Sequence, residues 1–441
     1  MMPVNGASGR RERGCVENQA TGNRRWVVLG TLTFVYVLNF LDRQLLGFLA
    51  KPIKDSLQIT DGQLGLIGGF YFACFYCFIA IPVGWLADRS NRVTILSLAC
   101  AIWSGATAAC GLATSYPQLV AARMVVGFGE AGGVPPSYAI ITDTFPPGKR
   151  GLAFGIFNFG PPAGAALGIA FGGWIAIAYG WREAFITIGV IGIIAAILVR
   201  VILRDPPRGG LDVAPAGGAT PYEKAPFWAT TRMFFTNPVL LLAALGSGAT
   251  QFVTYGLGNF AVLFLMEGKG MKLSEVSVWY ALAVLIGMGG SMIISGRALD
   301  ALTRHSRTGY AMAPAISLAI AMPFYVAFVW APGWPLALAL LTIVMLFNYV
   351  YLSASVALVQ EEVRPNQRVL SGALLLLVMN FIGLGLGPTY VGAASDWLKA
   401  HGHENTLQLA LYSITPFYLI AIFLFLWLAR YLRADRKAAI A

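Results

Sequence analysis

Residues 26–50 read WVVLGTLTFVYVLNFLDRQLLGFLA, an apolar run that carries two charged residues, Asp42 and Arg43, in its second half. An α-helix rises about 1.5 Å per residue, so crossing a bilayer core of about 30 Å takes roughly 20 residues. This run is long enough to cross, and its backbone must be helical in lipid because no water is present to satisfy free amide groups. We therefore expect a transmembrane helix that brings charge into the membrane.

The composition extends this interpretation to the whole chain. Of the 441 residues, 57% are hydrophobic and only 12% are charged. A soluble protein of this length could not hide so much apolar surface, so lipid must surround most of it. The net charge of +11 is no argument for nucleic-acid binding, because the basic residues form short clusters between apolar runs. The run after the polar arm at 1–25 is too long for a signal peptide, so we expect it to be retained.

The same length criterion predicts twelve transmembrane helices in two sets of six. A linker at 204–236, rich in Pro, Gly and charge, separates a first six-helix bundle at 26–203 from a second at 237–430, and a tail follows at 431–441. The predicted fold is an all-α membrane protein with two pseudo-symmetric six-helix bundles. The expected spans are 26–50, 64–87, 93–113, 119–142, 152–177, 184–199, 239–265, 276–295, 310–330, 335–359, 369–391 and 407–429.

The distribution of basic residues predicts the orientation of these helices. Cytoplasmic loops of membrane proteins carry an excess of Lys and Arg. With both termini placed in the cytoplasm, the loops on the opposite side hold only six of the 31 basic residues: Lys51, Lys54, Arg182, Lys269, Lys272 and Lys399. We expect cytoplasmic termini and, from the short loops and tails, a bacterial plasma membrane.

Within the twelve predicted spans there are four charged residues, all in the first and fourth: Asp42, Arg43, Arg123 and Glu130. Charge inside a membrane is costly and usually marks a functional site. Arg123 and Glu130 are seven residues apart and share a helix face. The alternative is that the four form purely structural ion pairs, but apolar packing would join two helices at lower cost. We expect a shared, water-reachable pocket.

No histidine lies within a predicted span, since His305, His401 and His403 all fall in loops. A proton carried through the membrane must then use Asp42, Glu130 or both. Burial disfavours the charged carboxylate and a nearby guanidinium favours it, so the balance can place proton exchange near physiological pH.

The two halves share two short patterns. A Gly-x-x-x-Asp pattern ends the second and eighth spans, and a Pro-x-x-Arg pattern begins the fifth and eleventh. The residues are Gly84 and Asp88, Gly296 and Asp300, Pro147 and Arg150, and Pro365 and Arg368. These matches suggest a duplicated six-helix unit, an arrangement that places the substrate site between the repeats.

Three motifs resemble those of the major facilitator superfamily. GWLADRSNR at 84–92 is similar to its signature loop, although Asn91 stands where the second Gly is usual. R-x-x-x-G-x-GEA at 123–131 resembles its Arg-bearing motif, and GPPAG at 160–164 its antiporter-associated motif, a weakened helix suited to bending. The resemblance implies a cytoplasmic gate formed by Gly84, Asp88, Arg89 and Arg92, in which the two arginines anchor at the lipid headgroups.

LNFLDR at 38–43 and RMVVGFGEA at 123–131 narrow the resemblance to the Spinster family, whose members move sphingosine phosphate and lysophospholipids. The resemblance is clearest over residues 26–200. It implies that Asp42 and Glu130 are the protonatable pair. It also implies that Arg43 and Arg123 serve the pairing network or bind an anionic headgroup, which suits the bidentate guanidinium.

The predicted spans of the second half carry no charge but do carry polar and aromatic side chains. Among these we expect Tyr255, Asn259, Tyr349 and Asn380 to line the cavity. A cavity that is charged on one wall and apolar and aromatic on the other suits an amphipathic solute. Each of these residues could instead serve only to bind helices together.

These features predict a proton-coupled carrier of a lysolipid or sphingosine-phosphate-like lipid, working by alternating access, as a monomer among membrane lipids. The alternative keeps the fold and takes a small organic anion, such as a hexuronate or sugar phosphate. That alternative is disfavoured because carriers of such anions in this superfamily generally have cations in both halves. A membrane-embedded enzyme would need a nucleophile–base pair or a metal cluster at membrane depth, which the spans lack. We expect no cofactor and no metal.

Overall fold

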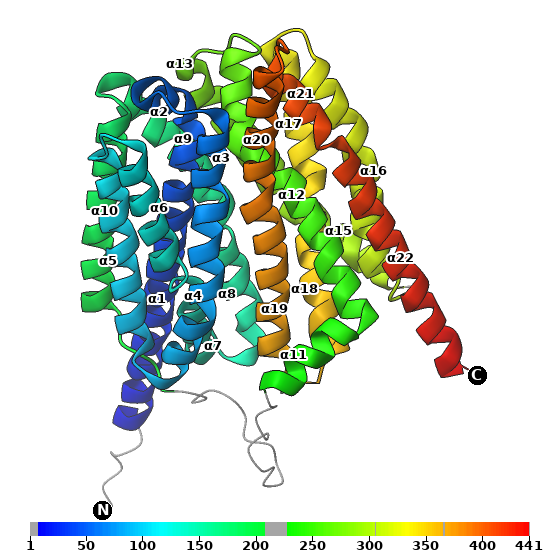
Figure 1. The fold of residues 1–441 in the computed structure, drawn as a ribbon. Helices are drawn as coiled ribbons and strands as arrows, with labels where there is room; N and C mark the ends of the chain where they lie inside the picture. The colour runs from blue at the N-terminus through cyan, green and yellow to red at the C-terminus, as the bar shows by residue number, and fades with distance from the viewer. Residues whose placement is uncertain (1–7, 208–226, 305, 365–366, 441) are drawn as a thin grey trace, which may run out of the picture.

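The computed structural model describes residues 8–207, 227–304, 306–364 and 367–440, which form helices and no strand. The first half comprises α1(Ser8–Phe48), α2(Ala50–Leu57), α3(Asp61–Gly68), α4(Phe70–Arg89), α5(Arg92–Gly111), α6(Tyr116–Glu130), α7(Val134–Thr144), α8(Pro147–Asn158), α9(Gly160–Ala178) and α10(Trp181–Ile202). Figure 1 shows this half beside the second one, with the start of α1 and the end of α22 at the same end of the molecule. We call this the terminal end and the opposite one the distal end.

The second half contains three π-helical turns among its α-helices. It comprises α11(Phe227–Thr236), α12(Pro238–Glu267), α13(Leu273–Glu275), η1(Val276–Tyr280), α14(Ala281–Val284), η2(Leu285–Gly289), α15(Gly290–Thr303), α16(Gly309–Trp330), α17(Trp334–Asn348), α18(Val350–Glu362), α19(Arg368–Asn380), η4(Phe381–Leu386), α20(Gly387–Ala400), α21(Thr406–Ser413) and α22(Thr415–Ile440). Residues 227–236, which we expected within the linker, form α11.

In the described part of the chain, eleven helical segments are long and apolar enough to cross a membrane. They are Arg24–Phe48, Asp61–Ala80, Arg92–Gly111, Leu152–Tyr179, Trp181–Ile202, Pro238–Glu267, Leu273–Thr303, Gly309–Trp330, Trp334–Glu362, Leu370–Ala400 and Thr406–Arg433. Each overlaps one predicted span, and the all-α membrane fold is confirmed. The remaining prediction, a continuous span at 119–142, is interrupted after Glu130, so α6 and α7 are each too short to count.

The Gly- and Pro-rich stretch at 160–164 follows an irregular residue, Phe159, between the end of α8 at Asn158 and the start of α9 at Gly160, within the single span Leu152–Tyr179. It also brings α9 against α1. A Cβ atom added to Gly164 would lie 2.3 Å from the carbonyl oxygen of Val37, and one added to Gly168 would lie 2.6 Å from that of Leu41. Only glycine permits this approach, which fixes α1 immediately beside Asp42.

The repeated Pro-x-x-Arg pattern makes equivalent bonds in the two halves. Arg150 Nε donates to the carbonyl oxygen of Thr142 at 3.0 Å, and Arg368 Nε donates to that of Gln360 at 2.9 Å. In both cases the acceptor lies eight residues before the arginine. Each guanidinium therefore satisfies a carbonyl group at the C-terminal end of the preceding span, as expected of a duplicated unit.

Asn91, the residue that departs from the superfamily pattern, is the N-cap of α5. Its side-chain oxygen accepts a hydrogen bond from the backbone N–H of Thr94 at 2.9 Å. Asparagine is among the most favourable N-cap residues, whereas glycine offers no side-chain acceptor. The departure therefore stabilises the start of α5.

Candidate functional site

The structure brings the four predicted membrane charges together where α1, α5 and α6 meet. Asp42, Arg123 and Glu130 are between 1% and 2% exposed, and the side chain of Arg43 is 10% exposed. None of them faces lipid. The site is thus buried within the first half, with Arg43 as its most accessible member.

Arg43 and Glu130 form the ion pair that joins α1 to α6. The Nε and Nη2 atoms of Arg43 both donate to Oε2 of Glu130, the first at 3.0 Å. Glu130 is the last residue of α6, and the helix breaks at residues 131–133 before α7 begins. The other oxygen of Glu130, Oε1, has no hydrogen-bond partner in the described chain.

Asp42 points away from this pair and toward α5. It accepts a hydrogen bond from the hydroxyl group of Thr107, and its second oxygen, Oδ1, has no partner among the described residues. Asp42 is adjacent to Arg43 on α1, and Arg43 donates to Glu130, so the two acids belong to one cluster. Sequence reasoning missed Thr107, because nothing in its local sequence separates it from the other hydroxyl residues that bond within helices.

Arg123 is buried and has no ion-pair partner within 4 Å among the described side chains. Its Nε and Nη1 atoms make no hydrogen bond to the described residues. Its guanidinium lies 5.1 Å from the centre of the Phe72 ring, and that of Arg43 lies 5.2 Å from the same centre. Phe72 therefore contacts both cations, a cation–π arrangement that compensates in part for lost water.

Aromatic rings also surround Arg43, at 4.9 Å for Phe40 and 5.1 Å for Tyr76. These rings were not predicted, since aromatic side chains at helical spacing more often belong to an ordinary core. From the second half, α12 packs against α1, where a Cβ atom added to Gly47 would lie 3.5 Å from the backbone of Asn259. Arg43 is one helical turn before Gly47 and therefore lies near the boundary between the halves.

The other second-half residues are distributed more widely than we expected. Asn259 packs at the distal side of the boundary, where a Cβ added to Gly68 would lie 2.4 Å from its Oδ1. Asn380 accepts a hydrogen bond from Gln251 at 3.2 Å. Tyr349 lies at the break between α17 and α18. The contacts described for Asn380 and Tyr349 are within the second half, whereas Asn259 also packs against α1 at Gly47, one helical turn from Arg43.

Among the predicted gate residues, Gly84 and Asp88 lie on α4, but their side chains fall outside the described part of the structure. Arg89 is exposed. Arg92 does not reach the lipid headgroups as we expected. It is buried, its Nη1 lies 2.5 Å from Asp143 Oδ2, and its Nε lies 2.8 Å from Asp205 Oδ1. Arg92 stays buried because two carboxylates satisfy more of the N–H donors of its guanidinium than a single partner could.

Replacing Arg92 by Gln is expected to destabilise the protein by about 3 kcal/mol, because two partly buried carboxylates lose their cation. The measurement is the thermal unfolding midpoint of purified protein in detergent. The matched control is Arg200→Gln, which removes an exposed arginine near the end of α10 and should leave the midpoint unchanged. Equal midpoints for the two variants would show that the Asp143–Arg92–Asp205 network does not stabilise the fold.

The distal end is closed by hydrogen bonds between the halves, where α3 and α20 lie side by side (Figure 1). Asp396 Oδ2 accepts from the backbone N–H of Gly62 at 2.9 Å. Ser395 donates to Asp61 Oδ2 at 2.7 Å, and Thr389 accepts from the backbone N–H of Phe70 at 3.2 Å. Access to the site from the distal side is therefore blocked in this conformation.

Charged residues reinforce the same closure. Lys54 Nζ lies 2.7 Å from Asp61 Oδ1 and 3.5 Å from Glu267 Oε2, which belongs to the second half. Burial alone would lower the pKa of Lys54, but the hydrogen bond and charge of Asp61, together with Glu267, outweigh it and raise the pKa above its usual value. Lys54 therefore stays charged, and this link between the halves persists, at physiological pH.

Deeper along the boundary, an aromatic contact joins α4 to the π-helical turn η4. The Phe381 ring packs edge-on against Phe70 at 6.5 Å and against Phe78 at 6.3 Å between ring centres. Such pairs are worth about 1 kcal/mol each beyond the apolar area they bury. They continue the contact between the halves below the polar closure.

Comparison with known proteins settles the family. Residues 32–388 match the model of the Major Facilitator Superfamily. The chain belongs to the major facilitator superfamily. It is accordingly an integral membrane transporter and not an enzyme.

Similar proteins include different kinds of carrier. This major facilitator protein is 31% identical over 377 residues to an MFS-type efflux pump of Mycolicibacterium smegmatis, covering 85% of each chain. It is 28% identical over 256 residues to a hexuronate transporter of Bacillus subtilis, covering 58% of this chain and 60% of the relative.

Among solved structures, a bacterial homologue of the human lysosomal transporter Spinster, in an inward-facing and unoccupied conformation, superposes with a TM-score of 0.83. The two are 31% identical, and the match covers 93% of this chain and 98% of the other. The predicted resemblance to the Spinster family is confirmed.

Proposed function

We propose that this transporter is a proton-coupled carrier of an amphipathic lipid with an anionic headgroup, of the lysolipid or sphingosine-phosphate type, with both termini in the cytoplasm. The observation that supports this most directly is the buried Arg43–Glu130 ion pair beside Asp42, at the boundary between the halves. Alternating access would close the distal end, as here, and then open it while the terminal end closes.

Proton binding at Glu130 would free Arg43. A neutral Glu130 no longer holds the guanidinium by charge, and Arg43, already the most exposed of the four, can then pair with a phosphate through its two-pronged guanidinium. Substrate and proton binding are linked in this scheme because both act on the same side chain. The state of Glu130 thereby biases the equilibrium between the two conformations.

Asp42 would be the second protonatable group. Its unpaired Oδ1 and the unpaired nitrogen atoms of Arg123 are buried polar atoms that are costly to leave without a partner. We therefore expect Asp42 to change its protonation state, and Asp42 and Arg123 to change their hydrogen-bond partners, during the transport cycle. Thr107 holds Asp42 in place while it does so.

A small organic anion is the second candidate, and the similarity to a hexuronate transporter supports it. Against it, α12, a second-half helix that packs against α1, carries no Lys or Arg and does carry a tyrosine, Tyr255. A tyrosine accommodates an alkyl chain or a glycerol group better than a second carboxylate.

Ligand-induced thermal stabilisation of the purified transporter distinguishes the two candidates. A ligand present at about 100 times its dissociation constant adds about 2.7 kcal/mol of stability. We expect lysophosphatidate or sphingosine phosphate to raise the unfolding midpoint, and glucuronate to leave it unchanged. A neutral detergent of the same chain length controls for insertion of the tail, and Arg43→Gln should abolish the lipid effect. Stabilisation by glucuronate alone would favour the organic-anion candidate instead.

A further inference from the structure

Helix α11 presents an unusual exposed face at the terminal end of the second half. Trp228, Arg232 and Phe235 recur at spacings of four and three residues, so they form one stripe along the helix. Trp228 is 79% exposed and Phe235 is 42% exposed. We call these three residues the α11 stripe.

The opposite face of α11 is anchored to the bundle. Thr230 and Phe234 are buried, and Phe234 belongs to a cluster that includes Val363, Leu374 and Leu375. This packing fixes the rotation of α11 about its axis. The stripe is therefore held outward by the fold and is not free to turn inward.

The position of α11 places the stripe at the boundary of the membrane. Asn237 alone separates α11 from the transmembrane helix α12, and it caps α12 by accepting a hydrogen bond from the backbone N–H of Val239 at 2.8 Å. Figure 1 shows α11 crossing the terminal end at an angle to α12. A helix so close to the start of a span lies at headgroup depth.

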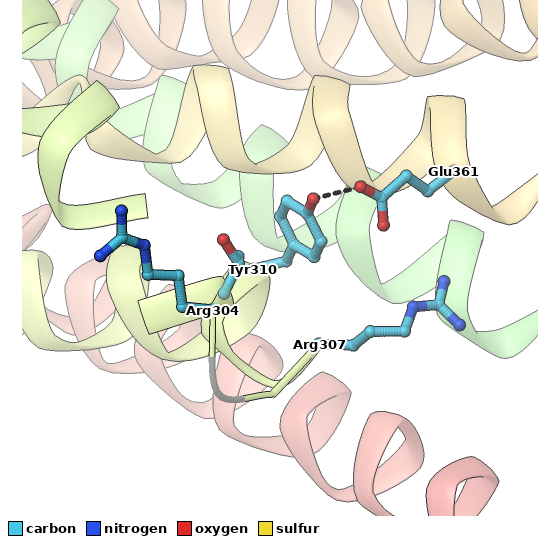
Figure 2. Close-up of a pocket in the computed structure, with 5 residues that line it drawn as sticks. Arg304, Arg307, Tyr310 and Glu361 are labelled. Atoms are coloured by element: carbon cyan, nitrogen blue, oxygen red, sulfur yellow. Dashed lines mark hydrogen bonds between the residues drawn. The ribbon is translucent and has the colours of Figure 1, made fainter. Parts of the chain in front are cut away.

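The surface around α11 is rich in exposed arginine. Among the described residues at the terminal end of the second half, the exposed arginines include Arg232, Arg297, Arg304, Arg307, Arg364, Arg368, Arg430 and Arg433. Two of them, Arg304 and Arg307, line a pocket of about 500 Å³ with Thr303, Tyr310 and Glu361 (Figure 2). In this pocket Tyr310 donates a hydrogen bond to Glu361, which leaves the two guanidinium groups at the rim.

A chain of hydrogen bonds connects the pocket to the end of α11. Arg307 Nη2 lies 2.8 Å from Glu362 Oε2, and Glu362 Oε1 accepts from Asn237 Nδ2 at 3.4 Å. Asn237 is also the residue that caps α12. The side chains of Arg307, Glu362 and Asn237 thus link the pocket and the end of α11 to the start of α12.

We propose that α11 is an interfacial helix that anchors the second half to the anionic membrane leaflet at the terminal end of the molecule. Trp228 and Phe235 enter the boundary between headgroups and acyl chains, and Arg232 with the surrounding arginines binds headgroup phosphates. Aromatic residues at headgroup depth combined with basic residues are typical of helices that lie in the membrane surface. The proposal rests on the transporter fold and is independent of the transported substrate.

Depth-dependent quenching of Trp228 tests the position of the stripe. The transporter is reconstituted in nanodiscs containing phosphatidylglycerol brominated either near the headgroup or near the chain end. The signal of Trp228 among the 11 tryptophans is the difference between the native protein and Trp228→Phe. We expect that difference to be quenched mainly by the shallow bromines. Quenching by neither lipid would overturn the proposal: with acrylamide quenching the stripe faces water, and without it the stripe is covered by protein.

A functional measurement separates this surface from the transport site. Transport is compared in liposomes with and without phosphatidylglycerol for the native protein, for Trp228→Ser combined with Phe235→Ser, and for Ala229→Ser, a polar change off the stripe. We expect the anionic lipid to stimulate the native protein and Ala229→Ser but not the double variant, with all three unfolding at similar temperatures in detergent. Equal stimulation of all three would contradict the proposal and leave the proposed carrier function untouched.

Discussion

Replacing Asp42 by Asn or Glu130 by Gln is expected to abolish pH-driven accumulation of substrate in proteoliposomes, lowering it to the level of liposomes without protein. Asparagine and glutamine keep the shape of the acids and can still accept hydrogen bonds from Thr107 and Arg43, but they cannot carry a proton. The carrier should therefore fold and bind substrate while losing the link to the proton gradient. The measurement is uptake at a series of imposed pH gradients.

Substrate exchange provides the internal control for these variants. Exchange of labelled for unlabelled substrate, at equal pH on both sides, requires the conformational change but no net proton movement. We expect both variants to retain exchange, and Asp55→Asn, which alters an exposed acid on α2, to retain exchange and accumulation. A pH response in both site variants equal to that of the native protein would disprove proton coupling through these two acids.

Replacing Gly65 by Ala is expected to prevent closure of the distal end. The added Cβ atom would lie 2.4 Å from the carbonyl oxygen of Pro388 on α20, so one backbone must move away. Overpacking of this kind costs about 1–3 kcal/mol. Because about 1.4 kcal/mol changes an equilibrium tenfold, the closed conformation should become about 5- to 150-fold less populated. Transport should fall by a similar factor, since closure occurs in every cycle.

A glycine in open surroundings supplies the matched control. Gly105 lies within α5, and an added Cβ there meets no atom within 4 Å. Gly105→Ala should transport normally. Labelling of a cysteine introduced at Ser395, in the distal closure, should be fast in Gly65→Ala and slow in Gly105→Ala. Slow labelling and normal transport in Gly65→Ala would show that α3 and α20 tolerate the extra atom.

The sequence was sufficient to predict what depends on composition and periodicity. Apolar runs of membrane length predicted the helices, and the rarity of charge inside them identified Asp42, Arg43, Arg123 and Glu130. The physical reason is that lipid penalises both free backbone groups and charge, so each exception is informative. The repeated Pro-x-x-Arg pattern likewise indicated a duplicated unit from the sequence alone, because its arginine bonds to a carbonyl group only eight residues earlier in the chain.

The features that could not be predicted depend on contacts between distant segments. Nothing in the local sequence distinguishes Thr107 or Arg92. Their partners come from α1, from α7 and from the segment that follows α10. The interruption of the fourth span after Glu130 was missed although the sequence carries its cause: Pro135 and Pro136, in the first turn of α7, have no N–H to bond to the carbonyl oxygens of residues 131 and 132. α11 carries too few residues to stand out from the polar linker before it.

The π-helical turn in η4 gives the eleventh span a property that a regular α-helix lacks. In such a turn each backbone hydrogen bond spans five residues and not four. The helix therefore accommodates one extra residue and stays continuous. By moving that extra residue, α19 can swing or slide relative to α20 while α20 stays bonded to α3. Phe381, at the start of the turn, would then change its contacts with Phe70 and Phe78. The part of the span in α20 could keep the distal end closed while the part in α19 opens the terminal end.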